Sequence, residues 1–269
     1  MVNLSFVQFK PIFGDVQGNL DQIKQLIPRA KHGIIVLPEL FSTGYIFASK
    51  EEAAKLAEGV PEGETCATLA DLSKNMNSTI VAGFAEKSGS KIYNSAMVVS
   101  HGKFLGVYRK AHLFYKEKLW FTPGKTGFSV FDTKDGNVGV MICFDWIYPE
   151  AARVLALNGA DVIAHPSNLV LPGLAQRGMR IRSLENRVFS ITANRVGIEK
   201  RGEDRFRFTG RSQIVGPKMK VLAAANATET AVKSIEVDLL EARNKNITKL
   251  NNLLEGRRAD LYTSLTKQA

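Results

Sequence analysis

The sequence contains little cysteine and no long apolar run, and both features narrow what the protein can be. Two of its 269 residues are cysteines, too few for the disulfide framework typical of small secreted domains. The longest apolar run, residues 138–144, is far shorter than the ~20 residues that a membrane-spanning helix needs. The first residues also lack the basic and apolar segments of a signal peptide. We therefore predict a cytoplasmic protein with no membrane partner.

The common motifs of metal and nucleotide sites are also missing. None of the four histidines stands at the spacing of a zinc-binding pair. Residues 124–126 imitate the end of a phosphate-binding P-loop, but the position that requires its first glycine is Leu119. No GxGxxG and no GxSxG motif occurs. We expect no metal and no organic cofactor.

Positive charge is in excess, with 36 Lys and Arg against 26 Asp and Glu and a formal net charge of +10. The basic residues are spread along the chain, and the densest group, within residues 200–211, is interrupted by Glu203 and Asp204. We interpret this group as a solvated loop or hairpin. We therefore predict no nucleic-acid partner, while a basic nucleic-acid binder stays as an alternative hypothesis.

Buried-strand and amphipathic-helix patterns alternate without a linker, which favours an α/β fold with mixed sheets. We predict one domain over residues 1–243 and a polar C-terminal extension over residues 244–269. Strands are predicted at 4–9, 34–37, 79–85, 93–100, 104–110, 137–144, 162–165, 189–196, 212–215 and 231–237, and helices at 15–30, 64–77, 149–158 and 174–188.

Three reactive side chains stand at the ends of apolar strands, where a rigid scaffold can present them to a cleft. They are Glu39, Lys110 and Cys143. Each alone has an ordinary explanation: a loop carboxylate, a surface charge and a small core residue. Together they offer a base, a cation and a nucleophile.

The segments around these residues resemble the three signature blocks of the nitrilase superfamily, the carbon–nitrogen hydrolases with a Glu-Lys-Cys triad. The segments are residues 37–41, 108–114 and 142–146, in the family's order. The resemblance implies an α-β-β-α sandwich of two mixed sheets, with subunits that pair into a longer stack. We therefore expect a homodimer or higher homo-oligomer, with the C-terminal extension as an oligomer contact.

The resemblance also implies catalytic roles. Glu39 would be the general base, Cys143 the nucleophile and Lys110 the cation that stabilises the oxyanion. Glu117 matches a further acidic residue of the family site, and the Phe144 N–H would be a second oxyanion donor.

Three neighbouring side chains are weaker candidates. Trp146 could line an acyl pocket or simply pack, and Tyr45 has the same two interpretations. Asn168 could position a ligand or satisfy a loop backbone. We include Tyr45, Trp146 and Asn168 as predicted substrate-binding residues.

The sequence leaves the small-molecule substrate open. Cys143-Phe144-Asp145-Trp146 resembles the amidase and carbamoylase branches and also short archaeal nitrilases. The prediction is hydrolysis of a small aliphatic amide or nitrile through a thioester or thioimidate on Cys143, releasing ammonia and a carboxylic acid. Hydrolysis of an N-carbamoyl amine or amino acid is the alternative, and a catalytically silent binding protein is a further one.

Overall fold

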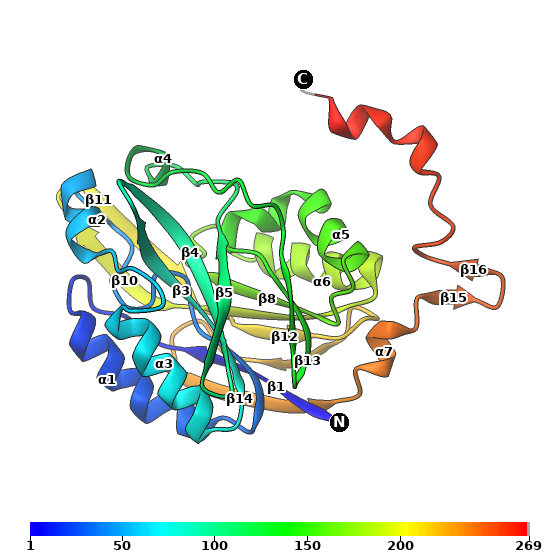
Figure 1. Cartoon of the computed structure of the whole chain (residues 1–269), viewed down its shortest axis with the longest axis horizontal. Coiled ribbons are helices and arrows are strands. Elements are labelled where there is room, and N and C mark those ends of the chain that lie inside the picture. Colours follow the sequence, from blue (N-terminus) through cyan, green and yellow to red (C-terminus); the bar gives the residue numbers. More distant parts are fainter. Residues whose placement is uncertain (268–269) are drawn as a thin grey trace.

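The computed structural model describes residues 1–267, and two six-stranded mixed sheets form its centre (Figure 1). Each sheet contains three neighbouring parallel strands, β1-β2-β3 in one and β7-β8-β9 in the other, flanked by antiparallel strands. The first sheet has the order β14 (Ala231–Val237), β1 (Val2–Gln8), β2 (Gly33–Val36), β3 (Thr79–Ser88), β4 (Lys91–Ser100), β5 (Lys103–Arg109). The second has the order β13 (Val221–Ala224), β12 (Gln213–Val215), β9 (Phe189–Asn194), β8 (Val162–Ser167), β7 (Gly136–Val140), β6 (Val130–Thr133).

Alternation along the strands divides the apolar side chains between two faces of each sheet. On β1, Leu4 and Phe6 join the core between the sheets, while Val7 faces the opposite side. On β8, Val162 and Ala164 join the central core, while Ile163 faces outward. Strands buried on both faces need helices over their outer faces.

Four helices supply that cover. Helices α1 (Val16–Leu26) and α3 (Glu64–Asn75) cover the first sheet, and α5 (Pro149–Leu157) and α6 (Leu174–Asn186) cover the second. The side chain of Asp15 caps α1 by accepting a hydrogen bond of 3.0 Å from the N–H of Gly18. The predicted α-β-β-α sandwich with two mixed sheets is confirmed.

The structure differs from the predicted elements at several places. The predicted strand 137–144 ends at Val140, because Cys143 begins the 3-10 helix η2 (Cys143–Ile147). The basic group forms a hairpin of β10 (Val196–Arg201) and β11 (Asp204–Thr209), one of the two forms expected for it. The predicted helix 15–30 is α1 followed by the 3-10 turn η1 (Ile27–Arg29), and the pattern did not reveal α2 (Lys50–Leu56), α4 (Glu117–Trp120), β6 or β13.

Beyond α7 (Leu240–Arg243) the chain leaves the sandwich and extends away from it (Figure 1). Short elements follow one another there: β15 (Asn246–Thr248), β16 (Asn251–Asn252), η3 (Ala259–Leu261) and η4 (Thr263–Thr266). Within residues 1–267, no helix has the length and apolar character needed to cross a membrane.

Candidate active site

The ends of β2 and β5 bring a carboxylate and an ammonium together. Glu39 comes three residues after β2, and Lys110 follows β5 directly. The backbone N–H of Lys110 donates to the Asn94 carbonyl at 2.8 Å, which fixes its position beside β4. Both side chains are fully buried, and Lys110 Nζ donates to Glu39 Oε1 at 2.7 Å. A buried charge of either sign is costly unless it is paired, so each group makes the burial of the other possible.

A second carboxylate, Glu117 at the start of α4, completes the environment of the ammonium. Lys110 Nζ donates to Glu117 Oε1 at 2.9 Å and to Oε2 at 2.8 Å. The Tyr45 hydroxyl donates to Oε1 at 2.8 Å, and the Phe114 N–H donates to Oε2 at 3.1 Å. The three donors of the ammonium therefore face three carboxylate oxygens, and Glu117 is fixed at both of its oxygens.

Glu39 is satisfied at one oxygen only. Its Oε1 accepts from Lys110 and, at 2.7 Å, from the side-chain amide of Asn94. Its Oε2 is buried and has no hydrogen-bond partner within residues 1–267. A buried carboxylate oxygen without a donor is costly, which makes this atom a natural acceptor for a proton or for a group on a bound molecule.

Cys143 lies on a tight turn, and a second network of hydrogen bonds stabilises this turn. Its φ of 42° lies in the left-handed region, which is rare for a residue other than glycine. The carboxylate of Asp145 accepts from the Ile142 N–H at 2.9 Å, from the Tyr108 hydroxyl at 2.8 Å and from the His112 N–H at 3.2 Å. These bonds come from separate parts of the chain, and together they stabilise the strained turn.

The backbone carbonyl of Cys143 has a side-chain partner, whereas the backbone N–H of Phe144 has no acceptor within its own helix. His165 Nε2 lies 2.9 Å from the Cys143 carbonyl oxygen, and His165 Nδ1 lies 3.1 Å from the Thr192 hydroxyl. Burial lowers the pKa of His165 to about 4, so it is a neutral hydrogen-bonding group at neutral pH. The N–H of Phe144 lies in the first turn of η2, where no intrahelical carbonyl can accept it.

Burial dominates the acid–base properties of the site. It raises the pKa of the Cys143 thiol well above its ordinary value; the Glu39 charge adds to that rise and the Lys110 charge opposes it. Burial also raises the pKa of Glu39, against the opposing effect of Lys110. Burial lowers the pKa of Lys110, but the carboxylates of Glu117 and Glu39 outweigh it, so the pKa stays above the ordinary value. The free protein therefore holds a neutral thiol beside a charged ammonium.

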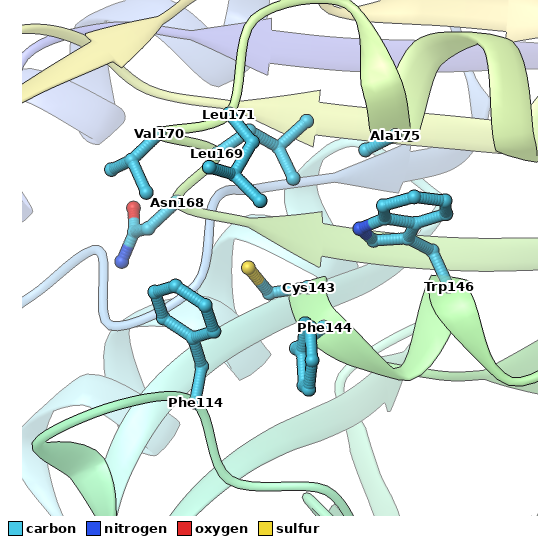
Figure 2. Close-up of a pocket in the computed structure, with 9 residues that line it drawn as sticks. All are labelled: Phe114, Cys143, Phe144, Trp146, Asn168, Leu169, Val170, Leu171 and Ala175. Atoms are coloured by element: carbon cyan, nitrogen blue, oxygen red, sulfur yellow. The ribbon is translucent and has the colours of Figure 1, made fainter.

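A small apolar pocket opens at the sulfur atom (Figure 2). Its volume is about 20 Å³, little more than the space of one water molecule. No charged side chain lines it; its walls are Phe114, Phe144, Trp146, Asn168, Leu169, Val170, Leu171 and Ala175. The ring of Trp146 packs against Gly178 of α6, where an added Cβ would lie 2.4 Å from the ring.

Comparison with known proteins identifies the family. The sequence profile described as carbon-nitrogen hydrolase matches residues 3–245. The chain belongs to this family. It is a carbon–nitrogen hydrolase of the nitrilase superfamily, as the resemblance predicted.

Individual relatives cover nearly the whole chain. A protein of Pyrococcus abyssi named nitrilase is 50% identical over 265 residues, which are 97% of this chain and 99% of the relative. An N-carbamoylputrescine amidase of Solanum lycopersicum is 35% identical, over 98% of this chain and 95% of the relative. The crystal structure of a carbon-nitrogen hydrolase from Helicobacter pylori G27 has a TM-score of 0.88 at 28% identity and covers 99% of both chains.

The predicted site residues of this carbon–nitrogen hydrolase form two adjoining groups, which the Asn168 side chain joins through its hydrogen bond to the Glu39 carbonyl. Glu39, Lys110 and Glu117 share hydrogen bonds, whereas Cys143, Phe144, Trp146 and Asn168 line the pocket. Tyr45 does not line this pocket; its hydroxyl donates to Glu117, and its side chain lines a separate small pocket with Trp120 and Phe206.

Sequence reasoning did not assign roles to several residues that build the site. Asn94 contacts Glu39, Asp145 accepts a hydrogen bond from the turn that carries Cys143, and His165 contacts the Cys143 carbonyl. Asp145 lies within one of the segments that resemble the family, but only the folded structure shows what the three residues contact. Within residues 1–267, no group of three or more histidine, cysteine, aspartate or glutamate side chains is arranged to hold a metal ion.

Proposed function

We propose that this enzyme hydrolyses a small aliphatic amide or nitrile through a covalent intermediate on Cys143. The observation that carries the proposal is the buried Lys110 ammonium, which bridges Glu39 and Glu117 while the second oxygen of Glu39 stays unpartnered. This arrangement offers a proton acceptor and a fixed positive charge next to a neutral thiol. Covalent catalysis by such a group divides a difficult substitution at an amide into two easier steps.

In the first step Glu39 acts as the general base. Its free Oε2 takes the thiol proton while the sulfur of Cys143 forms a bond to the carbonyl carbon. The carbonyl oxygen becomes an oxyanion, which the Phe144 N–H and Lys110 stabilise. Because the donors of Lys110 already face carboxylate oxygens, one of its hydrogen bonds would move from Glu117 to the oxyanion. One such donor typically contributes about 3–4 kcal/mol to the transition state.

The later steps return the enzyme to its starting state. Glu39 donates the proton to the departing nitrogen, so the C–N bond breaks and ammonia leaves a thioester behind. A water molecule that gives a proton to Glu39 then attacks the thioester. The C–S bond breaks, Glu39 returns the proton to the sulfur, and the carboxylic acid leaves. A nitrile would first give a thioimidate and would consume one more water. Glu117 would hold Lys110 in place throughout.

The pocket supports a short, uncharged acyl group. Its walls are mostly apolar and its volume is small. Trp146 would bound the acyl chain. Asn168 donates its side-chain N–H to the Glu39 carbonyl at 2.9 Å, and its Oδ1 is buried without a partner within residues 1–267. That oxygen could accept an N–H from an amide or carbamoyl substrate. The similarity to an N-carbamoylputrescine amidase keeps N-carbamoyl amines as the second candidate.

A screen for ammonia release tests the proposal. The substrates are acetamide, propionamide, propionitrile and N-carbamoylputrescine, each with the wild type, Cys143→Ala and a Cys66→Ala control. Cys66 is the only other cysteine, and it lies in α3, outside the pocket. We expect release from one of the first three compounds, lost in Cys143→Ala and retained in Cys66→Ala. Release from N-carbamoylputrescine alone would favour the second candidate, and release that survives Cys143→Ala would exclude the covalent route.

We further propose that residues 1–243 form the catalytic domain and that the 244–269 extension contacts another subunit in a homodimer. The outer faces of α5 and α6 carry exposed aliphatic side chains, namely Val154, Leu157, Ile181 and Leu184. The extension carries others, namely Leu250, Leu261 and Leu265. Apolar surfaces of this kind favour burial against a partner. Light scattering at micromolar concentration should give the mass of a dimer or larger assembly, and a monomer mass would contradict this part.

A further inference from the structure

A second and larger cavity lies behind the loop that forms one wall of the acyl pocket. Residues 168–171 of this loop line the acyl pocket, while Pro172 and Gly173 line the second cavity, whose volume is about 460 Å³. Three basic side chains surround it: Lys10 after β1, Arg207 on β11 and Arg211 after β11. Part of the net positive charge of the chain is therefore concentrated at this cavity, and these basic residues have no role in the proposed reaction.

The three basic groups have no counterion. All three residues are exposed, and none forms an ion pair with a carboxylate within residues 1–267. No aspartate or glutamate lines the cavity either. Gathering three like charges around one cavity costs electrostatic energy, and an anion bound there would reverse that cost.

The backbone has unusual conformations next to two of these side chains. Gly197 of β10 has a φ of +94°, and an added Cβ would lie 2.8 Å from the Lys10 side chain, so the Lys10 stem lies directly over this glycine. Gly210 and Arg211 both have left-handed backbones, with φ of 56° and 55°. A left-handed arginine is uncommon, and such conformations are concentrated at functional sites.

The N-terminus of α6 adds a further positive potential. Gly173, which lines the cavity, is the N-cap residue of this 13-residue helix, and no side chain caps the helix there. The first amide groups of a helix have no intrahelical acceptors, and the helix dipole places a partial positive charge at this end. Phosphate groups commonly bind where these features meet arginine or lysine side chains.

We propose that this cavity binds the phosphate group of a phosphorylated small molecule. A cavity of about 460 Å³ falls in the ~300–1,000 Å³ range of small-molecule sites. That space exceeds what a phosphate ion needs, and the remaining wall includes Ile198 and Ala227, which suit an organic group. A pocket with three charges gathered around it favours one phosphate group over an extended nucleic acid, which needs a continuous basic track.

Calorimetric titration of the full-length protein at low ionic strength tests the proposal with inorganic phosphate and phenyl phosphate as probes. We expect saturable 1:1 binding, tighter for phenyl phosphate than for phosphate. Arg207→Gln and Arg211→Gln should each weaken binding about tenfold, as for the loss of one charged hydrogen bond. Lys91→Gln removes an exposed charge at the start of β4, outside the cavity, and should leave the affinity unchanged.

The outcomes that overturn the proposal are distinct. They are absence of binding for both probes at millimolar concentration, equal binding by the arginine variants and the wild type, and an oligothymidylate complex that phenyl phosphate does not displace. If the variants fail to fold, phenylglyoxal modification of the wild type decides. Phenyl phosphate must protect Arg207 and Arg211 from the reagent, and unprotected arginines refute the site. None of these measurements needs turnover, so their result is independent of the proposed hydrolysis.

Discussion

Replacing Glu39 by glutamine should separate catalysis from thiol ionisation. In Glu39→Gln the Oε1 atom can still accept from Lys110 and Asn94, so the fold should be preserved. The unpartnered oxygen becomes an NH2 group, which cannot accept a proton. At the same time the Cys143 thiol loses the neighbouring charge that raises its pKa most after burial itself. We therefore expect turnover to fall while the thiol ionises at lower pH.

The size of the loss follows from the role of a general base. Such a group typically contributes 10²–10⁴-fold to the rate, or about 3–5 kcal/mol of transition-state stabilisation. Stability should change little, because Lys110 keeps its two bonds to Glu117 and the remaining pair is neutral. The pH profile of kcat/KM for the variant should also lose the acidic limb that comes from ionisation of Glu39. In the wild type Glu39 must be ionised to act, and its raised pKa places the acidic limb of kcat/KM above the ordinary value of 4.5.

The assay combines ammonia release with the rate of iodoacetamide labelling of Cys143 across a pH series. Cys66 serves as an internal reference, because it lies outside the site and burial raises its pKa to about 11. The expected result is a turnover loss of at least ~100-fold together with Cys143 labelling that shifts to lower pH. Turnover within a few-fold of the wild type, or labelling that shifts to higher pH, would refute the reasoning.

Three further changes test other parts of the site. Glu117→Gln should leave the unfolding midpoint nearly unchanged but lower kcat, since it weakens the contacts that position Lys110; normal turnover in a soluble variant would exclude that role. Because His165 has a pKa of about 4 in the fold and 6.5 in an unfolded chain, the unfolded state binds the extra proton between these values. Stability should therefore fall by about 3 kcal/mol as the pH drops through this window, and urea unfolding of wild type and His165→Gln at pH 7 and 4.5 should show a smaller fall in the variant. Gly178→Ala should push Trp146 into the pocket and raise KM about tenfold for propionamide but less for acetamide; an equal effect on both would contradict the pocket assignment.

The apolar pattern predicted an α/β fold with mixed sheets, because the central strands are buried on both faces, and the resemblance to the family implied the sandwich. Residues 34–37 and 162–164 are apolar runs of a kind that only a covered sheet can accommodate. The amphipathic helices that supply the cover were also recognisable. The cytoplasmic location, the oligomer and the roles of the site residues stay predictions.

Elements whose stability comes from distant partners could not be predicted in this way. Residues 140–142 are apolar and suggest that a strand continues to the nucleophile, but the Asp145 carboxylate ends it by accepting the Ile142 N–H. In the β10–β11 hairpin, Phe208 packs against Tyr45, while Arg205 and Arg207 on the alternate face are exposed. The many charged residues in this segment made its buried apolar face hard to recognise in the sequence. The contact of Tyr45 could not be predicted either, because its hydroxyl donates to Glu117, which is 72 residues away in the chain.

The raised pKa of the Cys143 thiol is compatible with its proposed role as nucleophile because Glu39, the proposed proton acceptor, is buried with it. Moving the thiol proton to Glu39 exchanges one buried anion for another. Burial raises the pKa of both groups, so the rise for Glu39 offsets part of the rise for the thiol in the free-energy cost of the proton transfer. The Lys110 ammonium is near both groups and favours whichever of them carries the charge. The thiol therefore stays protonated in the free enzyme, and it can ionise when a bound carbonyl carbon is available to receive the electron pair of the sulfur.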